Sequence, residues 1–213
     1  MQKSKKALII FLSLICILVV IALILIFQDN KKDRLIKLYK KVLESKSYTF
    51  SMEEDNKDYV YKMTVSQKEN NIKIDTQSGD DNSSTLILDG RVYVIMHKLK
   101  EYYIVDGDNV DGDIIISGLK EMANEKYVNG REEINGKTYY YEEYKDKSNF
   151  LQLVHETDDA KITTKFYFDN NNLVYIKNTV EDEGDKQEEL LKVILNYEVD
   201  SNIFKIPEDY AEM

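Results

Sequence analysis

The chain has 213 residues, with 39 acidic and 29 basic side chains and a net charge of -10. This length allows one domain with a short appendage, and a hydrophobic content of 43% excludes a wholly disordered chain. Residues 1–28 contain three lysines and no carboxylate, which leaves 26 basic against 39 acidic residues, a net charge of -13, in the rest of the chain. Nucleic-acid binding needs clustered Lys and Arg, so we expect no nucleic acid as a partner.

Residues 7–27 form an uncharged run in which Ser13 is the one polar side chain. At about 1.5 Å per residue, a helix of this length crosses a hydrocarbon core of roughly 30 Å, so the run predicts a single transmembrane anchor. A cleaved signal peptide is the weaker alternative, because no small-x-small cleavage site follows the run. We therefore expect residues 1–6 in the cytoplasm, residues 7–27 in the cell membrane and residues 28–213 in an extracytoplasmic domain.

Cys16 is the single cysteine and lies inside the apolar run. A lipobox could end at this position, but Ile15 stands where lipoprotein processing requires a small residue, so lipidation of Cys16 is the less favoured interpretation. The domain that follows can form no internal disulfide. Lysines flank the run on both sides, so the charge rule alone does not decide the topology.

An amphipathic helix is predicted directly after the anchor. Apolar residues recur at three- and four-residue spacing over residues 35–43, with lysines between them, and Asp29-Asn30 can cap the helix. One-sided helices most often cover a core, so we favour a helix packed on a sheet over a helix lying on the membrane surface.

From Tyr48 onwards the apolar period changes from 3.6 to 2, which predicts half-buried strands. The dipeptides Asp89-Gly90 and Asn135-Gly136 are strong signals for hairpins. Residues 114–123 predict a second short helix between two groups of strands, and the last strand is predicted from Leu190 to Val199. The predicted fold class is α+β, a large antiparallel sheet with one apolar face covered by two helices.

This order of elements resembles the LolA/LolB-like superfamily. The C-terminal segment from Asp200 through Phe204 to Pro207 is similar to the D-x-x-x-F-x-x-P segment in which many members end, and the hairpins at Asp89-Gly90 and Asn135-Gly136 are also similar to those of the group. The resemblance implies an incomplete β-barrel, a half-barrel whose concave face holds the helices. It also supports the extracytoplasmic location.

The resemblance also implies a class of function. The Lys-, Asn-, Ile- and Tyr-rich composition is similar to that of clostridial GerS-like germination proteins, which bind and activate a cortex amidase. It implies a non-catalytic regulator that binds a protein partner, such as a peptidoglycan-processing amidase at a spore membrane during germination. The alternative that the superfamily implies is lipid or lipoprotein binding and sorting through the concave apolar face.

Motifs for catalysis are absent from the sequence. It contains no G-x-S-x-G, no G-x-x-x-x-G-K-[ST], no H-E-x-x-H and no C-x-x-C, so we expect neither an enzyme nor a cofactor. The two histidines, His97 and His155, lack an identifiable third metal ligand, and we expect ordinary hydrogen-bonded histidines. The Asp-rich segment 106–113 does not have the EF-hand spacing, so no metal site is predicted. The paired carboxylates at 132–133, 142–143 and 181–183 indicate a solvated face.

Ten apolar strand residues are candidates for lining a ligand site in the concave face, where Met suits an adaptable binding surface. The alternative is that these residues form the core beneath the helices. The exposed strand edges and 16 tyrosines also make strand pairing with a partner, or a homodimer, physically plausible. The ten candidates are Phe50, Met52, Tyr61, Met63, Val65, Ile72, Ile74, Val92, Val94 and Met96.

Overall fold

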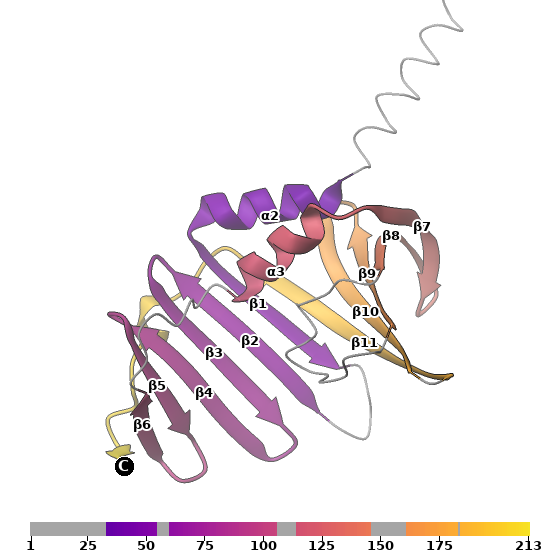
Figure 1. Ribbon diagram of the computed structural model, residues 1–213. Coiled ribbons are helices and arrows are strands. Elements are labelled where there is room, and N and C mark those ends of the chain that lie inside the picture. Colours follow the sequence, from indigo (N-terminus) through magenta and orange to yellow (C-terminus); the bar gives the residue numbers. More distant parts are fainter. Residues whose placement is uncertain (1–32, 55–59, 106–113, 146–160, 183) are drawn as a thin grey trace, which may run out of the picture. The chain divides into compact units, whose positions relative to one another are not determined.

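A computed structural model describes residues 33–54, 60–105, 114–145, 161–182 and 184–213 (Figure 1). The predicted anchor at 7–27, Cys16, the Asp29-Asn30 cap, the Asp-rich segment 106–113 and His155 lie outside these residues. Within the described part of the chain, no helix is both long enough and apolar enough to cross a membrane. Residues 35–213 form one compact unit.

Twelve strands form one open sheet in the order β12-β6-β5-β4-β3-β2-β1-β11-β10-β9-β8-β7. Within the described residues, two α-helices, α2 (Arg34–Ser45) and α3 (Ile114–Ala123), accompany the sheet. The strands are β1 (Ser47–Glu54), β2 (Tyr61–Lys68), β3 (Asn71–Ser78), β4 (Asp81–Leu88), β5 (Arg91–Met96), β6 (Glu101–Val105), β7 (Tyr127–Ile134), β8 (Lys137–Lys145), β9 (Lys161–Asp169), β10 (Asn172–Asp182), β11 (Asp185–Asn196) and β12 (Ala211–Glu212).

The sheet consists of two antiparallel meanders, β1 to β6 and β7 to β11, which α3 connects along the chain. The meanders join side by side where β1 pairs with β11, with Phe50 opposite Leu195 and Met52 opposite Val193. The described residues are mostly β-sheet with few helices, which confirms the coarser part of the predicted α+β class, and the sheet is open. The one parallel pairing in the described chain, between β12 and β6, was not predicted.

The predicted bounds of the last strand, Leu190 to Val199, are wrong at both ends. β11 begins at Asp185, because its charged first half pairs with the end of β10, with Lys186 opposite Glu181. It ends at Asn196, and the following residues leave the sheet. Hydropathy does not detect the first half, since its side chains are polar and its order comes from backbone pairing in a hairpin.

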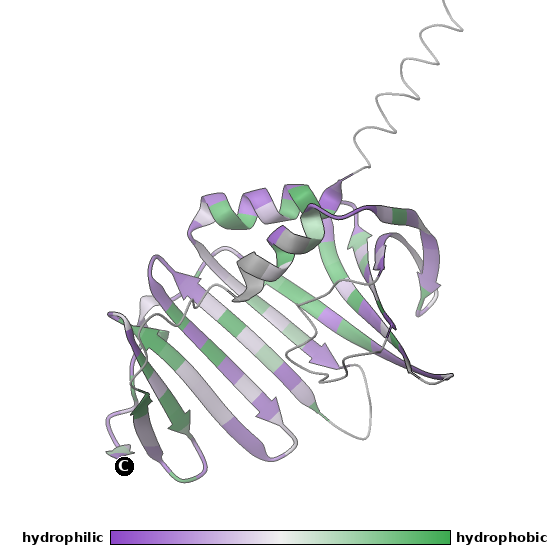
Figure 2. Ribbon diagram, in the orientation of Figure 1, coloured by the Kyte–Doolittle hydropathy of each residue, from purple (hydrophilic) through white to green (hydrophobic). Residues whose placement is uncertain are grey.

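The inner face of the sheet is the face that α2 and α3 cover (Figure 1). Leu35, Leu38 and Val42 of α2 pack in one cluster with strand residues such as Phe50 and Phe166, and none of these five side chains is more than 6% exposed. Apolar and polar residues alternate along the strands beneath the helices (Figure 2). The interpretation of residues 35–43 as a helix that covers a core is therefore confirmed.

The opposite, outer face is partly covered by the C-terminal segment. Phe204 is 7% exposed and packs in a second cluster with Leu86 and Ile95, both fully buried. Asp200 caps the short 3-10 helix Ser201–Ile203, because its carboxylate accepts a hydrogen bond of 2.9 Å from the backbone N–H of Asn202. The aspartate and the phenylalanine of the D-x-x-x-F segment thus have clear structural roles: one starts the turn and the other anchors it.

Glu142 corrects the prediction that the paired carboxylates form a solvated face, because it is 0% exposed on β8. Its Oε2 accepts hydrogen bonds from the backbone N–H of Leu35, at 3.1 Å, and from the hydroxyl of Tyr144, at 3.2 Å. The first turn of a helix has backbone donors without helical partners, and a carboxylate there is stabilised by the helix dipole. Glu142 therefore attaches the start of α2 to the sheet.

Candidate functional site

The ten candidate residues divide into two groups according to how the structure places them. Seven lie in the core beneath the helices: Phe50, Met52, Val65, Ile72 and Val92 are buried, and Met63 and Ile74 are partly buried against the same cluster. Tyr61, Val94 and Met96 are partly exposed and belong to neither core cluster. The structure thus brings most of the candidates together as packed core, and it sets Val94 and Met96 apart at the β5 end of the sheet.

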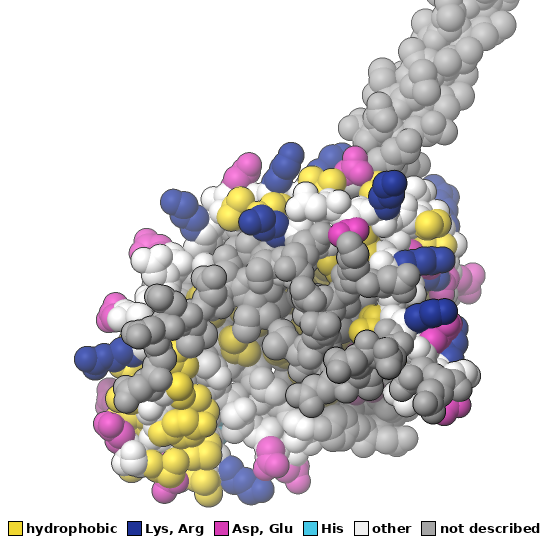
Figure 3. Space-filling model, in the orientation of Figure 1, with side chains coloured by type: hydrophobic (Ala, Val, Ile, Leu, Met, Phe, Trp, Pro, Cys, Tyr) yellow, Lys and Arg dark blue, Asp and Glu magenta, His cyan; other side chains and the backbone are white. Residues whose placement is uncertain are grey.

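Val94 and Met96 belong to an apolar surface, the β6 patch, which we define as Val94, Met96, Tyr103 and Val105. Val94 lies opposite Tyr103 in the register of β5 and β6, so the two side chains share the inner face. Tyr103 and Val105 are each 38% exposed. Hydrophobic side chains gather at this end of the sheet in the space-filling view (Figure 3). A cluster of exposed apolar residues marks an interaction surface more often than a single exposed apolar residue does.

Among the described residues, the outer edge of β6 is only partly paired. β12 lies along it for two residues, with Ala211 opposite Glu101 and Glu212 opposite Tyr102. The carbonyls of Lys100 and Tyr102 accept hydrogen bonds of 3.0 Å from the N–H groups of Ala211 and Met213. Backbone groups two residues apart point to the same side of a strand, so the N–H and C=O of Ile104 also face this edge. No strand of the described residues pairs with Tyr103–Val105 there.

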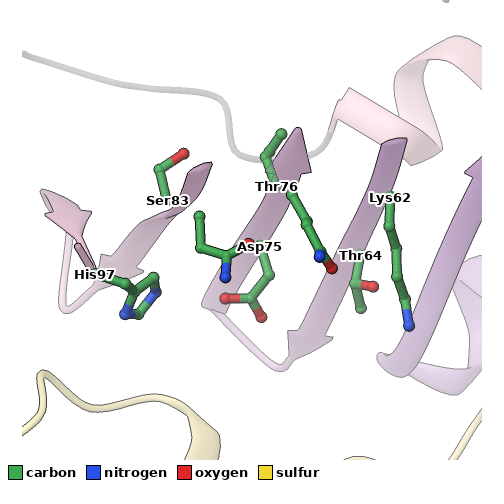
Figure 4. Close-up of a pocket in the computed structure, with 8 residues that line it drawn as sticks. Lys62, Thr64, Asp75, Thr76, Ser83 and His97 are labelled. Carbon is green, nitrogen blue, oxygen red and sulfur yellow. The ribbon is translucent and has the colours of Figure 1, made fainter. Parts of the chain in front are cut away.

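A polar pocket of about 340 Å³ lies near the end of the sheet where β2 and β4 begin and β3 and β5 end (Figure 4). Side chains of three neighbouring strands and of the turn after β5 line it, namely Lys62, Thr64, Asp75, Thr76, Gln77, Asn82, Ser83 and His97. Next to the pocket, the hydroxyl of Ser84 donates to Asp75 and lies 2.6 Å from Nε2 of His97. Nδ1 of His97 lies 2.9 Å from the hydroxyl of Tyr210 in the C-terminal segment.

The direction of this hydrogen-bond chain follows from counting protons. The single hydroxyl proton of Ser84 goes to Asp75, so Ser84 Oγ accepts from Nε2–H of His97. Nδ1 of the same ring lies 2.9 Å from the hydroxyl of Tyr210, so the chain continues to the C-terminal segment. Ser84 is 1% exposed and lies between His97 and the carboxylate, whereas a nucleophilic serine is accessible and its histidine is the group that the acid orients. The chain therefore holds Tyr210 against the sheet, and the expected hydrogen-bonded His97 is confirmed.

Charged side chains form a network on the outer face of β7 to β11. Lys165 Nζ lies 2.7 Å from Glu132, and the hydroxyl of Tyr167 donates to the same carboxylate at 3.0 Å. Lys177 and Lys186 lie 2.8 and 2.6 Å from the carboxylate of Glu188. Lys177 also lies 3.9 Å from the carboxylate of Glu132, so the contacts together link β7, β9, β10 and β11.

The network shifts the pKa values of its members in the directions that its contacts predict. Hydrogen bonds from Lys177 and then Lys186 lower the pKa of Glu188 to about 2. Burial of Glu132 acts to raise its pKa, but the hydrogen bonds from Lys165 and Tyr167 outweigh burial, and the net pKa is lowered. Burial, followed by the nearby Glu132 carboxylate, raises the pKa of Tyr167. Each shift keeps the group in the charge state that the ion pairs need, which is the behaviour of a stabilising network.

Two of the four residues of the β6 patch, Val94 and Met96, are among the concave-face candidates from the sequence, and Tyr103 and Val105 are not. Val94 and Met96 were candidates because they alternate with outer-face residues, whereas Tyr103 to Val105 read as one more strand of a meander. The sequence does contain a signal for them. A strand covered on one face alternates apolar and polar residues, whereas Tyr102 to Val105 is a run of four apolar residues without alternation.

Comparison with known proteins leaves the family open. The sequence matches no protein-family model and no curated protein. An uncharacterized conserved protein from Thermus thermophilus is similar in structure, with a TM-score of 0.49 and 10% identity over 84% of this chain and 96% of that one. The MucA/MucB complex of Pseudomonas aeruginosa gives a TM-score of 0.42 and 10% identity over 84% of this chain and 62% of that one. The LolA/LolB-like assignment remains a prediction.

Proposed function

We propose that this chain is a membrane-anchored, non-catalytic binding protein that acts on a partner protein. The observation that carries the proposal is the exposed β6 patch beside a strand edge that the described strands pair only in part. An apolar surface next to open backbone donors and acceptors is the arrangement used when a sheet binds an extended segment of another protein. The proposed anchor is the apolar run 7–27, and the resemblance to the LolA/LolB-like superfamily supports a domain outside the cytoplasm at a cell membrane.

The finer proposal is regulation of a peptidoglycan-processing amidase in spore germination or sporulation, as in GerS-like proteins. Its support is the resemblance of the C-terminal segment and composition. A tethered domain also suits a regulator that acts at one membrane better than a carrier that must diffuse between two.

A pair of matched variants tests the proposal. Tyr103→Lys places a charge in the β6 patch, whereas Val128→Lys places it on β7, at the opposite edge of the sheet, where Val128 is 56% exposed. Affinity capture from native membranes should recover a partner with the wild-type chain and with Val128→Lys, and lose it with Tyr103→Lys. Purified partner is then assayed for cell-wall amidase activity with and without the chain. Equal capture by both variants contradicts the proposed surface.

The alternative function is lipid or lipoprotein binding in the concave face. Seven of the ten candidate residues are packed beneath the helices, so a ligand there requires α2 or α3 to separate from the sheet. Native mass spectrometry distinguishes the two functions. The chain is released from detergent in the gas phase, and the mass shows what remains bound to it. A retained acyl ligand supports the alternative, and a ligand-free chain with a protein partner supports the regulator.

A further inference from the structure

We propose that β12 is a displaceable occupant of the β6 edge, and that the edge from Lys100 to Val105 receives an extended, basic and apolar segment of a partner protein. This inference rests on the proposed function and specifies how the partner binds. The contacts of β12, the charge around the edge and the backbone groups of Ile104, which no described strand pairs, each support one part of it.

The first step is that the β6 edge accepts a strand. β12 already pairs with it in parallel through two backbone hydrogen bonds, Ala211 N–H to Lys100 C=O and Met213 N–H to Tyr102 C=O. The backbone of Ile104 extends the same row of donors and acceptors past the point where β12 pairs. A longer segment on this edge would use both portions, and its inward side chains would cover Tyr103 and Val105 of the β6 patch.

The second step is that β12 is weakly held. Its residues Ala211 and Glu212 are exposed, and Met213 is 64% exposed. The attachments that do bury apolar surface come earlier in the C-terminal segment, at Phe204 and at Tyr210, whose hydroxyl contacts His97. Exposed backbone hydrogen bonds contribute little net free energy, because water replaces them when they open. β12 can therefore leave the edge while the rest of the segment stays docked.

The third step concerns the charge of the incoming segment. Lys98 and Lys100 are each neutralised in ion pairs, with Asp81 and Asp209. Glu101 lies on this edge and stays there when β12, with Glu212, leaves it, in a chain whose net charge is -10. A second copy of this chain would bring the same negative charge, whereas a segment with Lys or Arg between apolar residues complements the edge.

Two proline variants test the inference. Ala211→Pro removes the N–H that donates to Lys100, whereas the control Glu212→Pro removes an N–H that points away from β6. Glu212→Pro also removes the carboxylate that accepts an exposed hydrogen bond of 3.3 Å from the hydroxyl of Tyr102, and Glu212→Gln, which keeps an acceptor there, measures that loss separately. The probe is a fluorescein-labelled peptide of alternating Lys and Val, and the control peptide alternates Glu and Val. Fluorescence anisotropy with the full chain in detergent should show that Ala211→Pro binds the Lys/Val peptide about tenfold more tightly than wild type, with Glu212→Pro close to wild type.

Several results would overturn the inference. Equal affinities of Ala211→Pro and Glu212→Pro would show that β12 does not compete for the edge. Equal binding of the Glu/Val peptide would refute the basic partner, and a dimer of the Ala211→Pro variant that leaves the peptide unbound would assign the edge to a second copy. If the native partner is lost with Tyr103→Lys but the proline variants do not differ, the proposed function stands and this inference fails. If the partner survives Tyr103→Lys, the proposed function itself fails.

Discussion

Replacing Phe204 by alanine tests whether the C-terminal segment stabilises the sheet that it covers. The ring of Phe204 is 7% exposed and packs against Leu86 and Ile95, which are fully buried on the outer face. Truncation of a buried phenylalanine to alanine costs about 3–5 kcal/mol through lost burial and the cavity that remains. The C-terminal segment lies on the surface and can detach from the sheet, so the loss of stability cannot exceed the free energy with which the segment binds the sheet. We therefore expect a loss near the lower end of this range, about 3 kcal/mol.

Urea denaturation of the full chain in detergent, followed by circular dichroism, measures this loss. Leu99→Ala is the matched control: Leu99 lies in the turn between β5 and β6 and is 59% exposed, so its truncation should change the free energy of unfolding by less than about 0.5 kcal/mol. A Phe204→Ala variant as stable as the control would refute the reasoning, because Phe204 would then contribute no buried contact.

Three further predictions concern the sheet and its charges. Glu142→Leu removes the acceptor of the Leu35 N–H and should lower the free energy of unfolding by about 1.5–3 kcal/mol, more than Glu142→Gln, in the same urea assay. The folded-state pKa of Glu188 is lowered to about 2 from 4.5, so its contribution is present above about pH 4.5 and is lost as the pH falls toward 2; Glu188→Gln should remove that part of the pH dependence of unfolding. Gly130→Ala places a Cβ 2.7 Å from the hydroxyl oxygen of Tyr141 and should cost about 1–3 kcal/mol, a cost that disappears in a Tyr141→Ala background.

Regular elements were predictable because local patterns determine them. The 3.6 period of residues 35–43 reflects a helix with one face on a core, and α2 buries that face. Asn135-Gly136 sits at the predicted hairpin between β7 and β8, where both residues have positive φ, the conformation that a type I′ turn requires.

Features that depend on long-range pairing were not predictable in the same way. The sequence shows Glu142 only as part of a charged pair on a strand. Its burial depends on the packing of α2 against the sheet, where the N–H of Leu35, 107 residues earlier in the chain, donates to it. β12 has two residues and no periodicity, and its place is set by the backbone of β6. The β6 patch likewise depends on the sheet order, which places Tyr103 and Val105 on a strand near the end of the sheet, where each is 38% exposed.

Site-specific photo-cross-linking tests the central claim, that the chain binds a partner protein through the β6 patch, most directly. A benzophenone amino acid is placed at Tyr103 or, in a second variant, at Val128 on the opposite edge strand, and each variant is irradiated in native membranes. We predict a discrete adduct with one other protein from position 103 and none from position 128. Absence of an adduct at position 103, or the same adducts from both positions, would contradict the account.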